Sequence, residues 1–192
     1  MKGNAALLIL DIQNDFCHEE GKFSKMGMSV KKVQEMVPRL IEFIEIARKH
    51  NIPIFYSKQI ESDNVSPKNL KNQFGSGRLK PVCAPDSWGS ELYKLKPLPS
   101  EHVIEKHTYD FFSNEKLKQL LNKQDVDTLI ITGVNTDICV DTTLRSAFTL
   151  GYNIIIPEDL VASINQDTHK QLLRIFHQFF GEVVRSSDVF DS

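Results

Sequence analysis

The sequence predicts a three-layer α/β fold, in which a mostly parallel sheet of six strands carries helices on both faces. Apolar runs of strand length alternate along the whole chain with segments of helical periodicity. Apolar runs without polar alternation are typical of strands that are covered on both faces. Strands that alternate with helices indicate crossover connections and therefore a parallel sheet.

The predicted strands are apolar or β-branched runs of four to six residues. The first run is apolar throughout and stops at Asp11, while the run that ends at Gly133 gives the strongest strand signal in the chain. Strands of this length are ordinary for globular proteins. The predicted strands cover residues 5–10, 52–56, 102–106, 128–133, 153–157 and 181–184.

Four helices are predicted between these strands. The first stops at Asn51, either Ser113 or Asn114 is a suitable N-cap for the second, and Gly151 is a C-terminal stop for the third. The predicted helices cover residues 30–50, a segment through 117–121, residues 138–150 and residues 168–180.

The bulk composition predicts one globular domain over residues 1–192. The net charge of −2 gives no general attraction to nucleic acid or to an anionic membrane, so we expect neither as a partner. The first apolar run is too short to span a bilayer and has no small-residue cleavage site. Three widely spaced cysteines do not suggest a disulfide framework. We therefore expect a cytoplasmic protein.

Residues 57–100 show no sustained periodicity, and five of the eight prolines lie there. An irregular stretch of this length within a compact domain is usually functional or an oligomer contact, and otherwise a plain surface excursion. We expect these residues to shape a pocket, although the sequence does not say which of them do so.

Candidate site residues follow the predicted strands, because ligands in open parallel sheets bind beyond the carboxyl ends of the strands. Asp11 follows the first strand, and Lys106 ends the third. A carboxylate that emerges from an apolar strand needs a partner. Lys106 is that partner if both strands end at the same edge. Taken alone, this pattern describes an ordinary structural ion pair.

Cys139 follows the fourth predicted strand, in the first turn of a predicted helix. Free N–H groups and the helix dipole favour a negative charge there, so we expect a lowered thiol pKa, which a nearby lysine lowers further. The same N–H groups can face an oxyanion. A lone buried cysteine is more often a small core residue. The combination with Asp11 and Lys106 favours a nucleophile, whereas Cys17 and Cys83 have no such neighbours and are interpreted as incidental.

Three blocks of this sequence together resemble the isochorismatase-like cysteine hydrolases, the superfamily of nicotinamidases, N-carbamoylsarcosine amidases, ureidoacrylate amidases and biuret hydrolases. The blocks read LLILDIQNDF at 7–16, EKHTYDFF at 105–112 and TGVNTDICV at 132–140, and EDLVAS at 158–163 is a weaker fourth. The resemblance implies an isochorismatase-like, Rossmann-like fold and a catalytic triad. The implied triad consists of Asp11, Lys106 and Cys139.

The resemblance also implies a cis peptide between Val134 and Asn135, and an oxyanion hole formed by the backbone N–H groups of Asn135 and Cys139. The implied reaction is hydrolysis of a C–N bond in a small amide or ureide through a thioester on Cys139. Siderophore-type isochorismatases lack this cysteine, so vinyl-ether hydrolysis is the alternative. A non-catalytic member of the fold that binds a small molecule is another.

The family comparison further bears on metals, the pocket and assembly. Nicotinamidases bind a metal through histidines after the second strand, but residues 56–63 contain none, and we place His169 on a late helix away from the strand ends. We therefore expect no metal and no other cofactor.

Phe16, Trp88 and Tyr109 are candidate walls of the substrate pocket, or ordinary packing aromatics. The resemblance implies a homo-oligomer.

Two further alternatives are less favoured. No phosphate-binding glycine motif follows a predicted strand, which argues against a nucleotide-binding protein. A redox-sensing thiol protein would show peroxide-dependent oxidation of Cys139 without hydrolysis.

Overall fold

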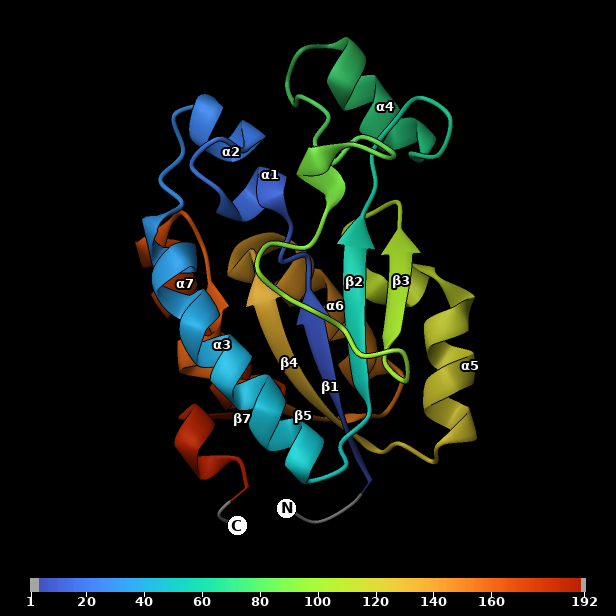
Figure 1. Ribbon diagram of the computed structural model, residues 1–192, viewed down its shortest axis with the longest axis vertical. Helices are drawn as coiled ribbons and strands as arrows, with labels where there is room; N and C mark the ends of the chain where they lie inside the picture. Colours follow the sequence, from blue (N-terminus) through green and yellow to red (C-terminus); the bar gives the residue numbers. More distant parts are fainter. Residues whose placement is uncertain (1–3, 191–192) are drawn as a thin grey trace.

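The computed structural model describes residues 4–190 and shows a twisted parallel sheet between two layers of helices (Figure 1). The strands pair in the order β3-β2-β1-β4-β5-β7, and β6 pairs with β4. Every pair of strands is parallel. The strands are β1 (Ala5–Leu10), β2 (Ile54–Gln59), β3 (His102–Lys106), β4 (Thr128–Val134), β5 (Asn153–Pro157), β6 (Val161–Ala162) and β7 (Glu182–Val184).

The predicted αβα fold is confirmed, with seven strands where six were predicted. The additional strand, β6, has only two residues and is therefore too short to produce a sequence period. The four predicted helices are also present, with small shifts at their ends. They are α3 (Lys31–Lys49), α5 (Glu115–Lys123), α6 (Asp141–Thr149) and α7 (Gln166–Phe179).

The sheet separates two hydrophobic cores. Leu7 and Ile9 of β1 pack with α3 on one face, while Leu8 and Leu10 pack with α5, α6 and α7 on the other. Successive side chains of a strand point to opposite faces, so a strand that is buried on both faces must be apolar throughout. This requirement explains the uninterrupted apolar run before Asp11.

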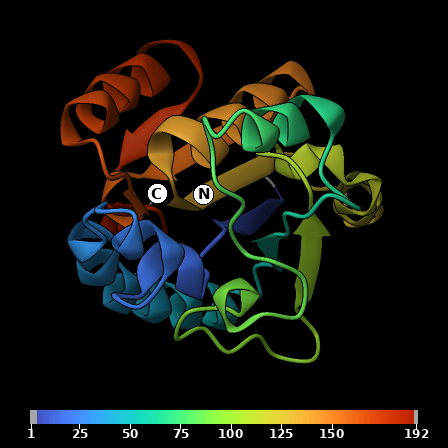
Figure 2. The ribbon, with the colours of Figure 1, turned by 90° about the horizontal axis from the view of Figure 1, so that it is seen from above.

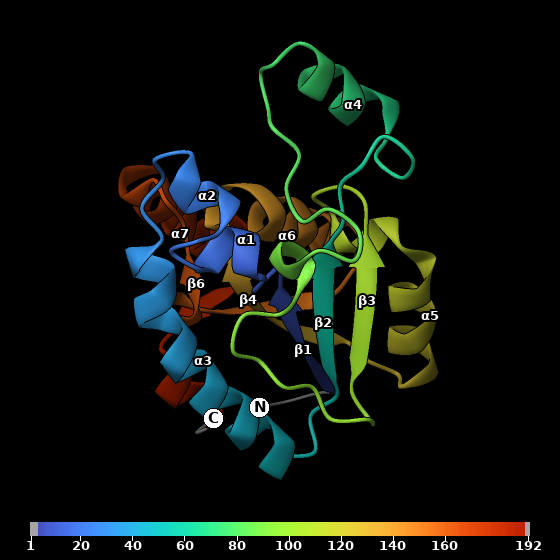
Figure 3. The same ribbon diagram turned by 45° about the horizontal axis from the view of Figure 1, so that its top comes forward.

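The stretch that the sequence predicts to be irregular contains an eight-residue helix, α4 (Lys68–Gly75). Figure 3 shows α4 standing out from the body of the molecule, beyond the ends of β2 and β3. Leu70 is the only buried residue of this helix. A helix of eight residues with only two large apolar side chains, Leu70 and Phe74, is too short to show a sustained helical period in the sequence.

The connections above the carboxyl ends of the strands are held together by buried polar side chains. Seen from above in Figure 2, the segments that follow β1 (blue) and β2 (green) lie around this edge. The Asp15 carboxylate, on α1 (Asn14–Cys17), accepts hydrogen bonds from the Cys83 and Lys22 backbone N–H groups, at 2.7 and 3.1 Å. Lys22 begins α2 (Lys22–Lys25). Gln13 donates to the carbonyls of Gln59 and Ser90, at 3.0 Å each.

Gly133 sets the spacing between β1 and β4 at their carboxyl ends. Its φ is 109°, and a Cβ at this position would lie 2.2 Å from the Leu10 carbonyl oxygen. A side chain would therefore force the two strands apart. The glycine keeps the segment after β4 close to Asp11.

No helix in the described residues is long and apolar enough to span a membrane.

Candidate active site

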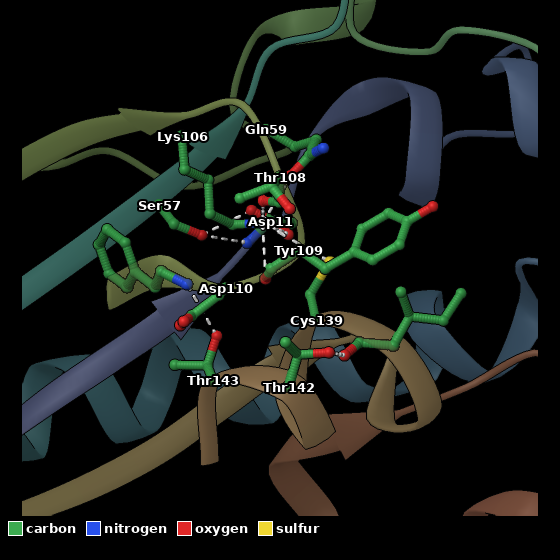
Figure 4. A network of polar contacts seen from close by, with 12 residues as sticks. Asp11, Ser57, Gln59, Lys106, Thr108, Tyr109, Asp110, Cys139, Thr142 and Thr143 are labelled. Atoms are coloured by element: carbon green, nitrogen blue, oxygen red, sulfur yellow. Dashed lines mark hydrogen bonds and ion pairs between the residues drawn. The ribbon is translucent and has the colours of Figure 1, made fainter. Parts of the chain in front are cut away.

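Asp11, Lys106 and Cys139 converge at the carboxyl ends of β1, β3 and β4 (Figure 4). Strand β2 lies between β1 and β3, so the long Lys106 side chain crosses the end of β2 to reach Asp11. Lys106 Nζ lies 2.8 Å from Asp11 Oδ2 and 3.6 Å from Cys139 Sγ. The expectation that these strand ends share one edge is confirmed.

Lys106 is a fully buried ammonium group. Its Nζ donates to Gln59 Oε1 at 2.6 Å and to the carbonyls of Thr108 and Tyr109 at 3.0 and 3.1 Å. Burial lowers the pKa of Lys106, but the Asp11 carboxylate beside it, with a contribution from the Cys139 side chain, outweighs burial and raises this pKa above the ordinary value. The lysine therefore keeps its proton.

The two oxygens of Asp11 have different surroundings. Oδ1 accepts a hydrogen bond from the Ser57 hydroxyl at 2.5 Å, and the Asp11 backbone N–H donates to that same hydroxyl at 3.1 Å. Oδ2 lies beside Lys106 Nζ and accepts no hydrogen bond among residues 4–190. Asp11 has a φ of +53°, a left-handed conformation that aspartate tolerates. One oxygen is thus fixed while the other is available to the thiol.

Cys139 lies in a π-helical turn, Thr136–Val140, that precedes α6, and not in the first turn of a regular α-helix. It is 5% exposed. Burial raises its pKa well above the ordinary value, the charge of Lys106 lowers it in part, and Asp11 raises it further. The prediction of a lowered thiol pKa is therefore wrong, because desolvation outweighs the lysine. In the resting protein the thiol carries its proton.

The Cys139 thiol borders a cavity of about 90 Å³. Phe16, Val82 and Tyr109 supply apolar surface, and Gln59 and Glu61 supply polar surface. A second cavity, of about 610 Å³, shares some of the same walls. We call the smaller space beside Cys139 the inner cavity and the larger one the outer cavity. The residues that line both cavities are Phe23, Leu79, Lys80, Asn135 and Ile138.

The candidate pocket residues have different positions. Phe16, Tyr109 and Asn135 line the inner cavity, and the Val134–Asn135 peptide bond is cis. Trp88 is not among the described residues that line this cavity. Its side chain is 45% exposed, and its ring packs edge-on against His18 at 5.0 Å.

The sequence reasoning missed three polar residues near the carboxyl end of β2. Ser57 binds Asp11, Gln59 binds Lys106, and Glu61 lines the inner cavity. The strand-end rule that identified Asp11 and Lys106 applies equally to β2. The side chains that this strand end presents are a hydroxyl, an amide and a carboxylate, so the absence of histidine there does not mean the absence of site residues.

The residues after β2 do not fit the metal site expected of a nicotinamidase. The corresponding segment carries Gln59 and Glu61 and no histidine. Within residues 4–190 no group of three or more His, Cys, Asp or Glu side chains is arranged to hold a metal. The placement of His169 away from the strand ends is wrong, because its Nδ1 lies 2.9 Å from the hydroxyl of Thr136, just after β4.

The fold and site together define a class of protein: a parallel α/β domain with a thiol, a carboxylate and an ammonium group at one sheet edge. The family model for the isochorismatase domain matches residues 5–188. The chain therefore belongs to the isochorismatase family, and the resemblance found in the sequence is confirmed.

Curated relatives and solved structures agree with this assignment. The chain is 27% identical to the ureidoacrylate amidohydrolase RutB of Enterobacter sp. (strain 638), over 98% of this chain and 89% of that protein. It is also 27% identical to nicotinamidase 3 of Arabidopsis thaliana, over 88% and 78% of the two chains. The N-carbamoylsarcosine amidase structure from Thermoplasma acidophilum superposes with a TM-score of 0.81 and 25% identity, covering 97% and 99%.

Proposed function

We propose that this protein is a cysteine hydrolase that cleaves a C–N bond of a small amide or ureide through a thioester on Cys139. The observation that carries the proposal is the buried cluster of Asp11, Lys106 and Cys139 beside a cavity. The names of the relatives support this reaction, since they include an amidohydrolase, a nicotinamidase and an amidase.

In the first half-reaction, Asp11 Oδ2 takes the proton of the Cys139 thiol while the sulfur attacks the substrate carbonyl carbon. The raised thiol pKa supports proton removal during attack in place of a preformed thiolate. The tetrahedral intermediate then collapses, the C–N bond breaks, and Asp11 gives the proton to the leaving nitrogen. An amine or ammonia departs and a thioester remains.

In the second half-reaction, Asp11 removes a proton from water as the water oxygen attacks the thioester carbon. The C–S bond breaks, the acid product leaves, and the proton returns to Cys139. Lys106 Nζ, 2.8 Å from Asp11 Oδ2, offsets the negative charge of the Asp11 carboxylate at the start of each half-reaction. This role requires that Lys106 remain charged throughout the cycle.

We assign the oxyanion hole to the backbone N–H groups of Asn135 and Cys139. Both residues line the inner cavity, which supports their being within reach of a substrate carbonyl. Removing one donor from such a hole typically costs about 3–4 kcal/mol of transition-state stabilisation.

We further propose that residues 1–192 form a single domain and that the protein works as a cytoplasmic homo-oligomer. The three free cysteines, all of them buried, support a reducing compartment. Light scattering of the purified chain tests the oligomer, and a mass equal to one chain at micromolar concentration would contradict it.

The test of the reaction is ammonia release from a panel of carboxamides and ureides. Isochorismate, a vinyl ether without nitrogen, is tested separately by release of pyruvate. We expect ammonia release by the wild type and none by Cys139→Ala. Cys83→Ala is the matched control, because this buried cysteine forms no part of the cluster. A thioester predicts added mass on Cys139 after a rapid quench with substrate. Release that survives Cys139→Ala would contradict the proposal.

A further inference from the structure

Glu61 is a buried carboxylate in the same cavity as the Cys139 thiol, and the mechanism above does not use it. The residue is 5% exposed and follows the end of β2. Acidic side chains are rarely buried to this extent without a partner. Its position beside the nucleophile indicates a role in the site.

The hydrogen bonds of Glu61 come from two neutral donors. Oε2 accepts from the Val82 backbone N–H at 2.9 Å, and Oε1 accepts from the Gln59 side-chain amide at 3.1 Å. A carboxylate offers about four acceptor positions, so these two bonds leave capacity for further donors. Glu61 lines the same cavity as Cys139.

Gln59 connects Glu61 to the catalytic cluster. Its amide oxygen accepts from Lys106 Nζ at 2.6 Å while its amide nitrogen donates to Glu61. Lys106 Nζ can only donate, so it fixes which way the Gln59 amide points and directs the amide nitrogen toward Glu61. Glu61 is therefore held in a defined position relative to Cys139.

We propose that Glu61 is a specificity-determining residue that accepts a hydrogen bond from an N–H or ammonium group of the substrate. This inference rests on the proposed hydrolase function and narrows its substrate class. The reacting end of the substrate then carries a second hydrogen-bond donor beyond the scissile bond. An acceptor at that position, such as a pyridine nitrogen, faces the carboxylate and is rejected.

The size of the inner cavity supports a small reacting end. Its volume of about 90 Å³ is well below the roughly 300–1,000 Å³ of pockets that enclose a whole drug-sized ligand. Any further part of the substrate extends into the outer cavity of about 610 Å³. The donor that reaches Glu61 must then lie within a few bonds of the carbonyl that Cys139 attacks.

The test uses thiol reagents of different charge, so that it does not depend on turnover. Cys139 in the full-length protein is treated with aminoethyl, methyl or sulfonatoethyl methanethiosulfonate. Each labelling rate is measured by intact-protein mass spectrometry. It is then divided by the rate of the same reagent with N-acetylcysteine, which corrects for the reactivity of the reagent itself. We expect the wild type to react with the aminoethyl reagent at least tenfold faster than with the methyl reagent. Cys139→Ser identifies any labelling of other cysteines.

Glu61→Gln should lower the ratio of aminoethyl to sulfonatoethyl rates at least tenfold. Glu61→Asp keeps the charge and should preserve most of the ratio. The matched control is Glu105→Gln, which removes the same charge from an exposed position next to Lys106 and should leave the ratio unchanged. An unchanged ratio in folded Glu61→Gln overturns the proposal. A wild type that shows no preference for the aminoethyl reagent also overturns it, even if Glu61→Gln does not fold.

These outcomes are distinct from failure of the proposed hydrolase. If no amide is cleaved but the rate ratio depends on Glu61, the recognition site stands and the reaction is wrong. If amides are cleaved and the rate ratio does not depend on Glu61, the proposed hydrolase function is supported and the recognition role of Glu61 is wrong. With an active substrate in hand, Glu61→Gln should raise KM more than it lowers kcat.

Discussion

The floor and the outer wall of the site are built in contrasting ways. The floor consists of Asp11, Gln59 and Lys106, which sit on or directly after paired parallel strands and are buried. The wall includes residues 74–80, on α4 and the loop after it, and these residues are half-buried or exposed. The floor is thus fixed by strand register and hydrogen bonds, whereas the wall depends on sparse packing. We infer that the floor provides the chemistry and that the wall, together with Glu61, tunes the choice of substrate.

The largest effect should come from removing the base in the floor. Asp11→Asn keeps the shape of the side chain but has no carboxylate to accept the thiol proton. General-base catalysis typically contributes about 10²–10⁴-fold, so kcat should fall by roughly 10³-fold or more. The measurement is steady-state ammonia release by a variant whose circular dichroism matches the wild type. A kcat within tenfold of the wild-type value would remove Asp11 from this role.

The next largest effect is on the free energy of unfolding, which should respond differently to substitutions in the floor and in the wall. Lys106→Met leaves the Asp11 carboxylate buried without its cation, and breaking such a pair costs about 3–5 kcal/mol. Lys80→Met, in the exposed wall, should change the free energy of unfolding by no more than about 0.5 kcal/mol. Urea denaturation of both variants measures the difference. Equal losses would mean that the wall is as tightly integrated as the floor.

A double variant sharpens this prediction. In Asp11→Asn combined with Lys106→Met, neither buried charge remains unpaired. The loss of stability should therefore be smaller than the sum of the two single losses. Additive losses would indicate that the two side chains contribute independently, and the ion pair would then not be what stabilises the floor.

The same contrast explains what the sequence could reveal. Asp11 and Lys106 were predictable because each follows or ends a strand that has a strong local pattern, and parallel strands end at one edge. Ser57 and Gln59 obey the same rule and could have been found with it. The fold was predictable for a similar reason, since strands buried on both faces must be apolar throughout.

The wall was not predictable because its position depends on contacts between distant segments. Asp15 holds the backbone of Cys83, and Gln13 holds Ser90, over separations of 68 and 77 residues. No local period records such contacts. The raised pKa of Cys139 was missed for the same reason, because burial is a property of the assembled site while the sequence shows only the charge of a nearby lysine.

The pH dependence of Cys139 alkylation is a further test of the floor. Because burial raises the thiol pKa above its ordinary value of 9.0, the thiolate fraction at neutral pH is small. The iodoacetamide rate should therefore still be increasing with pH above pH 9, whereas a free thiol approaches its plateau there. Mass spectrometry of the labelled protein gives the profile. A plateau below pH 8 would show that Lys106 outweighs burial and that the resting state is a thiolate.

The smallest effect should come from the wall itself. Phe74 on α4 lines the inner cavity. Its apolar side chain makes no hydrogen bond to Asp11, Lys106 or Cys139. Phe74→Ala removes apolar contact that is the same in the ground state and the transition state, so KM should increase about tenfold while kcat stays unchanged. Steady-state kinetics on an active amide make the measurement, with Phe179→Ala, an exposed residue at the end of α7, as the control. A fall in kcat at constant KM would mean that α4 also positions the reacting groups, and the division between chemistry in the floor and selection in the wall would then fail.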